Sequence, residues 1–366
     1  MDHKALSEKL RERGGRLANT TVAMGFDGFV DTIAHVIRSK ESNNTPHWMA
    51  EARELGHYIL ERSGKNFSLE LDEVTTKVGG NMPIMASALG QFGISVNCVG
   101  AFGYPAVHTI FHAMPAACQL HSFSEPGIST AIEFKDGKMI LGRMGGLNSA
   151  GWETIKERIG MPVLKEVFEY SDLIGILNWS ELDKGTDIWE GFLTDIAPKD
   201  IESKRQIIFF DLSDCTKRSQ PDILKALALL KTFGKKYKVA LGLNHNEGQM
   251  IDGVLNAGSQ PWNSFEDLGK RLFDKLDVDL LLLHSAQQAL VCSGEGTCCE
   301  KSFTVEQPLI STGAGDNFNA GFCLGMLLEL HTHEALLLAH ATANQYVQKG
   351  KSPDFKDLIS FFEKFE

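Results

Sequence analysis

The chain has 366 residues, of which 43% are hydrophobic and 23% charged, and its formal net charge is −11. This composition is ordinary for a globular protein with a large core, and the acidic balance argues against nucleic acid as the main partner because phosphate backbones select basic surfaces. The seven cysteines are scattered without Cys-x-x-Cys spacing, and no apolar run has the length of a membrane span or signal peptide, so we expect a cytoplasmic protein with reduced thiols.

Short apolar or β-branched runs alternate with longer amphipathic stretches along the chain. The runs expected to be strands are residues 21–25, 96–100, 173–177, 207–211, 239–243 and 280–283. The stretches expected to be helices are residues 83–92, 154–170, 188–196, 222–237, 265–276, 316–330, 334–348 and 355–365. Near-continuous apolar strands separated by helices indicate an α/β protein whose parallel sheet is covered on both faces. Ligands of such sheets bind at the carboxyl ends of the strands.

Two segments, at about residues 29–78 and 120–147, break this alternation. An Asp-Gly turn within residues 129–144 separates two alternating runs and predicts a β-hairpin. Residues 67–78 are also expected to be extended, and residues 43–63 form an insertion with one helix. We therefore expect small antiparallel strands that project from the α/β core as a lid over the substrate.

The string Ser-Thr-Gly-Ala-Gly-Asp-Asn-Phe at residues 311–318 carries the strongest chemical signal. Gly313 and Gly315 permit backbone torsions that other residues avoid, and an apolar helical pattern begins behind them. The N–H groups and positive dipole end of such a helix make an anion site. Asp316 beside a bound anion suits a general base or metal ligand, as in phosphoryl transfer. The alternative is an ordinary helix cap with Asp316 in the first turn.

The longer pattern T-G-A-G-D-x-F-x-A-G-F closely resembles the C-terminal signature of the ribokinase (PfkB) carbohydrate-kinase family. The resemblance implies that the amides of Gly313, Ala314 and Gly315 form an anion hole and that Asp316 is the catalytic base. It also implies a ribokinase-like three-layer α/β/α core with a small β lid, in a single domain over residues 1–366. The implied substrates are a sugar and ATP with Mg²⁺, K⁺ is a further candidate cofactor, and a homodimer through the lid is a candidate assembly.

Residues that resemble the family's sugar site lie near two expected strands. Gly79, Gly80 and Asn81 correspond to the N-terminal glycine pair and a hydroxyl-binding asparagine. Their alternative role is a strand-to-helix turn with Asn81 as N-cap. Asp31, with Asp27 as second choice, corresponds to an aspartate that accepts hydroxyl protons of the acceptor. For either aspartate, the alternative is a solvated or capping role.

A candidate metal site follows the strand at residues 239–243. Asn244 and Glu247 match the family's N-x-x-E motif, whose amide and carboxylate oxygens suit Mg²⁺ with retained waters. A capping box at a helix start is the alternative. Asp211 also matches a family aspartate, but the Asn-x-Arg element that should follow it is degraded here, so Asp211 remains only a candidate.

The nucleotide side departs most from the family pattern. His284, Ser285 and Ala286 replace a T-x-G-x-x-G element, and Asn344 resembles part of the wall beside adenine. Some of these features also resemble ADP-dependent sugar kinases, which leaves the phosphoryl donor less defined than the reaction. The sequence predicts transfer of the ATP γ-phosphoryl to a sugar hydroxyl. The alternatives are a nucleoside kinase, an ADP-dependent sugar kinase, or a catalytically silent protein that binds sugar or nucleotide on the same fold.

Overall fold

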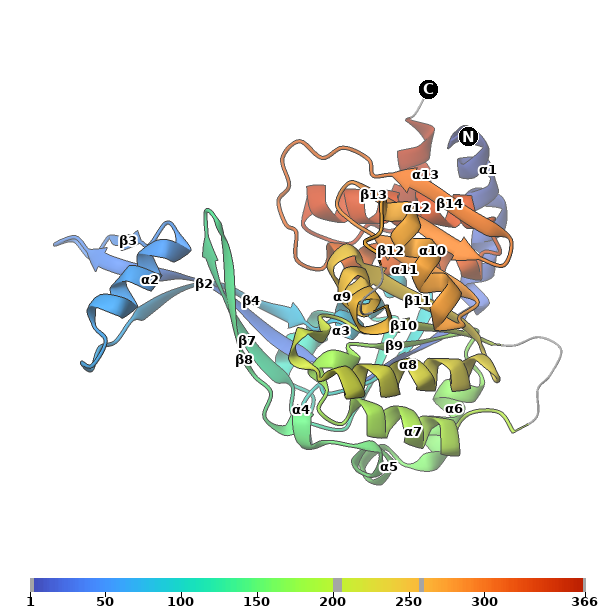
Figure 1. Cartoon of the computed structure of the whole chain (residues 1–366), viewed down its shortest axis with the longest axis horizontal. Coiled ribbons are helices and arrows are strands. Elements are labelled where there is room, and N and C mark those ends of the chain that lie inside the picture. The colour runs from blue at the N-terminus through green and yellow to red at the C-terminus, as the bar shows by residue number, and fades with distance from the viewer. Residues whose placement is uncertain (1–2, 200–205, 257–259, 365–366) are drawn as a thin grey trace.

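A nine-stranded sheet forms the centre of the molecule, and an arm of strands projects from it (Figure 1). The computed structural model describes residues 3–199, 206–256 and 260–364. In sheet order the strands are β14 (Gly296–Lys301), β13 (Gln288–Ser293), β12 (Leu280–His284), β11 (Lys238–Asn244), β10 (Ile207–Asp211), β9 (Leu173–Leu177), β1 (Thr21–Gly25), β5 (Ser95–Gly100) and β6 (Cys118–Ser122). The strands from β12 to β6 are parallel, and β13 and β14 are antiparallel additions at one edge.

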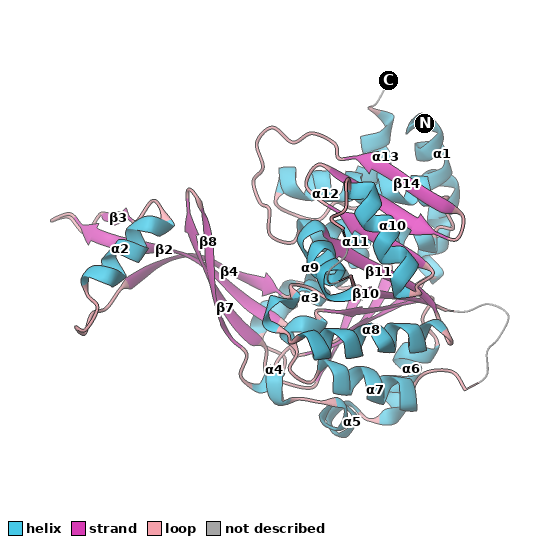
Figure 2. Ribbon diagram, in the orientation of Figure 1, coloured by secondary structure: helices cyan, strands magenta, loops and turns pink. Residues whose placement is uncertain are grey.

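Helices cover both faces of this sheet, as Figure 2 shows. One face packs against α1 (His3–Arg13), α3 (Asn81–Gln91), α11 (Ala314–Leu327), α12 (Thr332–Lys349) and α13 (Phe355–Glu363). The other face packs against α4 (Gly146–Ser149), α5 (Trp152–Ile159), α6 (Met161–Glu169), α7 (Gly185–Asp195), α8 (Gln220–Gly234), α9 (His245–Leu255) and α10 (Phe265–Leu276). Alternate strand residues enter the two cores, Ala23 and Ile208 on one side and Val22 and Phe209 on the other, because successive side chains of a strand point to opposite faces.

The predicted three-layer α/β/α architecture is confirmed, with local differences. The helix expected over residues 154–170 is wrong, since Gly160 has φ 91° and separates α5 from α6. Strands β6, β13 and β14 and helices α1 and α4 were not anticipated, and α9 was anticipated only through the helix start that was the alternative at Asn244. The predicted helix at residues 355–365 ends at Glu363 in α13, and its last residue lies outside the described part of the chain. The same holds for residues 1–2, 200–205, 257–259 and 366 of the predicted single domain.

The projecting arm is a second sheet, which we call the lid. Its strands are β3 (Pro46–Trp48), β2 (Phe29–Lys40), β7 (Gly127–Phe134) and β8 (Gly137–Arg143), with β4 (Glu70–Gly79) also paired to β2. The hairpin expected from the Asp-Gly turn is β7–β8. The sequence predicted a lid of antiparallel strands. This prediction is wrong for one pair, because β2 and β7 run parallel where both leave the core. Residues 120–122, placed in the lid from the sequence, belong to β6 of the main sheet.

The insertion at residues 43–63 enlarges the end of the lid. It contains β3 and α2 (Ala52–Glu61), which confirms the expected helix. Leu55 of α2 packs with Val36, Met49 and Ile132 in a small separate core. Among the helices that the structure describes, none could span a bilayer.

Candidate active site

The glycine loop predicted as an anion hole leads directly into α11. Gly313 has φ 89° and is the N-cap of this helix, and Ala314 and Gly315 form its first turn. The Ala314 N–H donates to the Ser311 carbonyl at 3.2 Å, at the long end of the hydrogen-bond range. The helix start presents N–H groups and the positive end of the dipole at this point, which suits an anion.

The back of this loop is held by two side chains that the sequence did not point to. The Tyr346 hydroxyl donates to the Thr312 carbonyl at 2.8 Å. A Cβ atom on Gly313 would lie 2.8 Å from that hydroxyl oxygen and 3.2 Å from Ile84. Only glycine therefore fits between the loop and its support.

Asp316, the predicted base, lies in the first turn of α11 and is 8% exposed. Burial first, and then the carboxylates of Asp211 and Asp27, raise the pKa of Asp316 well above its usual range, while a side-chain hydrogen bond with Asn81 opposes that shift. Glu247 also raises it. The fold thus brings four carboxyl groups from different parts of the sequence to one place.

Asp27 is the most buried of these four groups. Its Oδ1 accepts from the Met82 N–H at 2.9 Å and its Oδ2 accepts from Asn178 Nδ2 at 2.7 Å. Burial raises the pKa of Asp27 to about 7. Gly80 has φ 92°, and a Cβ there would lie 2.6 Å from Asp27 Oδ2. Asp27 therefore joins the ends of β1 and β9 to the start of α3, and it has no exposed surface in this state.

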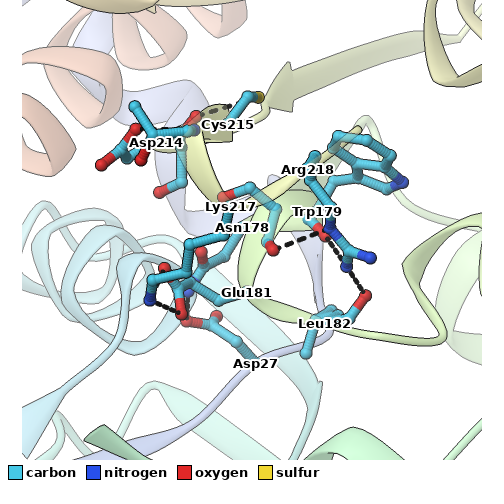
Figure 3. Close-up of polar contacts among 12 residues, drawn as sticks. Asp27, Asn178, Trp179, Glu181, Leu182, Asp214, Cys215, Lys217 and Arg218 are labelled. Atoms are coloured by element: carbon cyan, nitrogen blue, oxygen red, sulfur yellow. Dashed lines mark hydrogen bonds and ion pairs between the residues drawn. The ribbon is translucent and has the colours of Figure 1, made fainter. Parts of the chain in front are cut away.

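Figure 3 shows how the loops after β9 and β10 support this contact. Arg218 donates to the carbonyls of Trp179, Ser180 and Leu182, and its guanidinium carbon lies 5.0 Å from the centre of the Trp179 ring. These bonds fix the turn that begins at Asn178, which has the left-handed φ of 61°.

Asp31 lies in the lid, at the base of β2. It accepts a hydrogen bond from Ser129 Oγ at 2.6 Å on Oδ1. A Cβ on Gly79 would lie 2.1 Å from the Asp31 carboxyl carbon, so glycine at that position makes room for the carboxylate. Burial raises the pKa of Asp31, and Ser129 and Lys77 lower it. Asp31 and Gly79 are therefore neighbours, as a shared sugar site requires.

Asn244 and Glu247 form a capping box at the start of α9, the alternative noted from the sequence. Asn244 Nδ2 donates to Glu247 Oε1 at 2.6 Å, and the two backbone N–H groups donate to the partner's side chain. Glu247 is nevertheless buried, and burial, followed by the charge of Asp211, raises its pKa to about 8. In the described residues no three His, Cys, Asp or Glu side chains are grouped so as to hold a metal on their own.

Asp211, which the sequence left as a candidate, stands at the carboxyl end of β10 beside this group. It accepts from the Ser213 N–H and from Asn319 Nδ2, each at 2.8 Å. Burial raises the pKa of Asp211 to about 6. Asn319 comes from the second turn of α11, so the helix that carries Asp316 also orients Asp211. Asn178 and Asn319 each have a buried Oδ1 with no hydrogen-bond partner among the described residues.

The predicted nucleotide residues fall into two groups. His284 ends β12, its ring lies 4.9 Å from that of Phe318, and a Cβ on Gly315 would lie 3.3 Å from its Cε1. Burial lowers the pKa of His284 to about 4. Ser285 and Ala286 form the following turn, in which Ser285 Oγ accepts from two backbone N–H groups.

Asn344 is separate from this group. It is 6% exposed, and its Nδ2 donates to the carbonyls of Phe303 and Thr304 at 3.2 and 3.4 Å. Its Oδ1 accepts from Gln348. The side chain therefore secures the segment after β14, and a helical asparagine with this role gives no sign of it in the sequence.

The lid reaches the anion-hole loop through a residue that sequence reasoning missed. Lys138, on β8 just after the hairpin turn, donates to Thr312 Oγ1 at 2.5 Å. The structure thus brings together Gly313, Ala314, Gly315, Asp316, Asn81, Asp27, Asp211, Glu247 and His284 around the carboxyl ends of the strands, with Asp31, Gly79 and Lys138 on the lid side.

The sequence matches one known protein family over almost its whole length. The model of the prokaryotic ketohexokinase family matches residues 2–365. A ketohexokinase of Haloferax volcanii is 28% identical over 361 residues, which cover 97% of this chain and 93% of that protein.

Solved structures share the fold at low sequence identity. A ribokinase of Arabidopsis thaliana complexed with ribose and ATP superposes with a TM-score of 0.65 at 17% identity, over 95% of this chain and 99% of that one. A putative ribokinase II of E. coli in complex with ATP and Mg²⁺ has a TM-score of 0.64 at 13% identity, over 94% and 99% of the two chains.

Proposed function

The chain belongs to the prokaryotic ketohexokinase family and is a carbohydrate kinase, and we propose that it transfers the γ-phosphoryl group of ATP to a hydroxyl of a ketohexose. The observation that carries this proposal is the position of Asp316, a buried carboxylate in the first turn of a helix whose N-cap is Gly313. In this arrangement the helix start stabilises the transferring phosphoryl group while the carboxylate removes the proton of the attacking hydroxyl.

The sugar is held between the lid and the start of α3. Asp31 has one oxygen occupied by Ser129, and its other oxygen can accept from a sugar hydroxyl. Gly79 and Gly80 allow the sugar to approach the backbone, and Asn81 contacts both it and Asp316. Asp27 is fully buried, so we assign it the role of fixing Gly80 and the start of α3 rather than contacting the sugar.

The carboxylates around Asp316 fit a magnesium–nucleotide complex. Asp211, Asp27 and Glu247 raise the pKa of Asp316, and Asp211 raises the pKa of Glu247. No ion pair with a lysine or arginine is found for any of these four groups within the described residues. We propose that Glu247 holds Mg²⁺ through water, with Asn244 orienting it and Asp211 alongside, because Mg²⁺ retains several waters and takes further ligands from substrate phosphates. When bound, Mg²⁺ would neutralise charge on the donor phosphates.

The donor nucleotide is expected beside His284. The ring of His284 packs on Phe318 and against Gly315, so it forms the wall of the anion hole on the side of β12. Ser285 and Ala286 continue this wall. Asn344 would act indirectly, by holding the segment at residues 303–304 near the nucleotide.

The lid excludes water so that the donor is not hydrolysed. Lys138 brings a positive charge from the lid to the anion-hole loop. A homodimer through the lid is supported by the apolar side chains that the lid exposes, among them Trp48, Val74, Ile140 and Leu141. A requirement for K⁺ stays a prediction, which turnover in K⁺ and Na⁺ buffers would test.

The test is a kinase assay of the purified protein with ketohexoses, aldohexoses, ribose and nucleosides, each with ATP and with ADP. We expect the highest kcat/KM with a ketohexose and ATP. Preference for a nucleoside, or turnover with ADP alone, would move the protein to one of the alternative kinases. Binding of sugar and nucleotide without turnover for any pair would contradict the proposal.

A further inference from the structure

Asn317 is the residue after Asp316 in α11, and its side chain is fully buried. The pattern T-G-A-G-D-x-F leaves this position open, so the family resemblance assigns it no role. Its amide nevertheless makes two hydrogen bonds. Nδ2 donates to the Gly313 carbonyl at 2.9 Å, and Oδ1 accepts from Ser352 Oγ at 2.7 Å. One side chain therefore connects the anion-hole loop to the segment between α12 and α13.

The bond to the Gly313 carbonyl bears on the direction of an anion-hole amide. A trans peptide is planar, and its C=O and N–H groups point in opposite directions. Asn317 holds the Gly313 carbonyl towards the body of α11 with its backbone N–H, at 3.0 Å, and with its side chain. The Ala314 N–H belongs to the same peptide and therefore points out of the helix start. Its bond to the Ser311 carbonyl, at 3.2 Å, is the one that a phosphoryl oxygen would replace.

A second carbonyl of the loop is held in the same way. The Tyr346 hydroxyl donates to the Thr312 carbonyl, which belongs to the same peptide as the Gly313 N–H. Tyr346 lies on α12, and Ser352 lies in the segment that follows this helix. Two successive peptides of the loop are therefore fixed from the C-terminal part of the chain, and Asn317 carries this support to the second peptide.

We propose that Asn317 is a positioning residue for phosphoryl transfer: it orients the Ala314 N–H towards the transferring group, and Ser352 orients Asn317. This role rests on the proposed kinase function, whereas the hold on the loop does not. A neutral amide suits the position, because a carboxylate there could not donate to the Gly313 carbonyl. The effect on the reaction belongs to the transition state, in which charge develops on the phosphoryl oxygens, rather than to binding of the substrates.

Two variants separate the bond to the loop from the packing of the side chain. Asn317→Ala removes both side-chain hydrogen bonds, whereas Asn317→Ser leaves a hydroxyl that can donate to the carbonyl four residues back, which is that of Gly313. The matched control is Gln345→Ala. Gln345 is a buried amide that donates to the Asp357 carbonyl at 3.2 Å and accepts from Lys349, and none of its hydrogen bonds within the described residues reaches the loop.

The hold on the loop is tested on the substrate-free protein, by hydrogen exchange and mass spectrometry of a peptide that covers residues 311–316. We expect exchange in this peptide to be at least about threefold faster in Asn317→Ala than in the natural chain, because fewer hydrogen bonds restrain the loop. Asn317→Ser and Gln345→Ala should exchange there as the natural chain does. Equal exchange in Asn317→Ala and the natural chain would overturn the proposal.

Turnover with the best acceptor is measured next. We expect kcat of Asn317→Ala to fall by about 10 to 100-fold with little change in KM for sugar or ATP, since removing an anion-hole donor outright lowers kcat by about 10² to 10³-fold. Asn317→Ser should recover most of this loss, and Gln345→Ala should keep the natural kcat. Ser352→Ala keeps Asn317 and loses only its support, so its kcat should fall by a smaller factor. This variant decides the question if Asn317→Ala does not fold, and an unchanged kcat would then overturn the proposal.

A transition-state mimic separates positioning from a general structural effect. Binding of Mg-ADP with aluminium fluoride and the acceptor should weaken about tenfold in Asn317→Ala, while binding of Mg-ADP alone is unchanged. Equal weakening of both complexes, or a loss of kcat as large in Gln345→Ala, would overturn the proposal. If the natural protein has no activity on any acceptor, it is the proposed function that fails, and the exchange measurement still decides whether Asn317 holds the loop.

Discussion

Lys138 Nζ donates to Thr312 Oγ1 at 2.5 Å, which joins the lid to the anion-hole loop across 174 residues of sequence. The contact places an ammonium group one residue before Gly313. In the presence of a nucleotide the same ammonium group can turn from the neutral Thr312 hydroxyl to the transferring phosphoryl group, because a hydrogen bond between two charged groups is stronger. Lid closure and charge stabilisation would then be one event.

Replacement of this lysine should therefore impair chemistry more than binding. Lys138→Ala is expected to lower kcat by about 10 to 100-fold with a smaller change in KM for the sugar, since the charge is needed chiefly in the transition state. Steady-state kinetics with the best acceptor measure this. Lys135→Ala is the matched control, because Lys135 is exposed in the same hairpin. Equal kinetics for the two variants would remove Lys138 from the mechanism.

Asp316 is expected to carry the proton transfer. Asp316→Asn keeps the shape of the side chain and its place in α11 but removes the basic oxygen, so kcat should fall by about 10² to 10⁴-fold. ATP affinity, measured by calorimetry, should be nearly unchanged. Near-normal turnover of this variant would show that another group accepts the proton.

The architecture could be predicted because it follows from local patterns. The buried strands of residues 173–177 and 207–211 are short apolar runs, and their bounds agree with β9 and β10. Strand β14 was missed because it has no apolar run and its register depends on β13, whereas β13 was missed although its residues 289–292 form a short buried apolar run. The break at Gly160 was missed because the apolar spacing continues through it.

The candidate site could be predicted only where its residues are adjacent in sequence. The loop from Gly313 to Asp316 is one such stretch. The contact between Asp27 and Asn178 spans 151 residues and joins the ends of two strands. No motif near either residue predicts that the two side chains meet. The contacts of Tyr346 with the anion-hole loop and of Asn344 with residues 303–304 could not be predicted either, since the same helical pattern is typical of a tyrosine or asparagine that faces solvent. Asn344 itself was expected beside the nucleotide.

The role of the Glu247 charge can be tested by a substitution that leaves most of the capping box of α9 in place. A capping box accepts glutamine in place of glutamate, so Glu247→Gln should keep the bond from the Asn244 N–H at the start of α9, lose the bond from Asn244 Nδ2 and remove the carboxylate charge. We expect the Mg²⁺ concentration for half-maximal turnover to rise, with sugar binding in the absence of nucleotide unchanged. Glu334→Gln, in the corresponding capping box of α12, is the control. A loss of sugar affinity with an unaltered Mg²⁺ requirement would count against the assignment.

The buried carboxyl groups should make the ligand-free protein less stable as pH rises. The pKa of Glu247 is raised to about 8 and that of Asp27 to about 7, whereas both groups titrate near 4 when unfolded. The folded protein then holds protons that the unfolded chain has released, so their stabilising contribution is full below about pH 4 and is lost as pH rises towards the folded pKa values.

The useful window is about pH 7.5 to 8.5. The buried histidines His284 and His340, whose pKa values are lowered to about 4, are neutral there in the folded state, and a histidine of the unfolded chain, with a pKa near 6.5, is largely neutral as well. We expect Tm to fall across this window, and to fall less in Glu247→Gln. Mg²⁺ with nucleotide should raise Tm more at about pH 8.5 than at about pH 7.5. A Tm that rises with pH, or a slope that Glu247→Gln leaves unchanged, would contradict this electrostatic account.

The phosphoryl donor is the last question that the site poses. His284 places a ring against Gly315, at a position where the sequence has lost the glycines of the family's nucleotide element. The ring leaves less space in which the protein backbone can approach the nucleotide. We therefore expect ATP to bind weakly, or the site to accept GTP as well as ATP. Because the Gly-Ala-Gly-Asp loop is intact, ATP should still support the fastest turnover.

Calorimetric titration with ATP, GTP and ADP, followed by turnover with each, tests this order. His284→Thr removes the ring and restores the small polar residue expected from the family pattern, and it should tighten ATP binding while leaving KM for the sugar unchanged. Ser285→Ala is the control for the turn itself, although its hydroxyl accepts two backbone N–H groups and some loss of stability is expected. Efficient turnover with ADP and none with ATP would show that ADP is the donor. Asp316 would remain the proposed base in that case, because the proton transfer to its carboxylate is the same for either nucleotide.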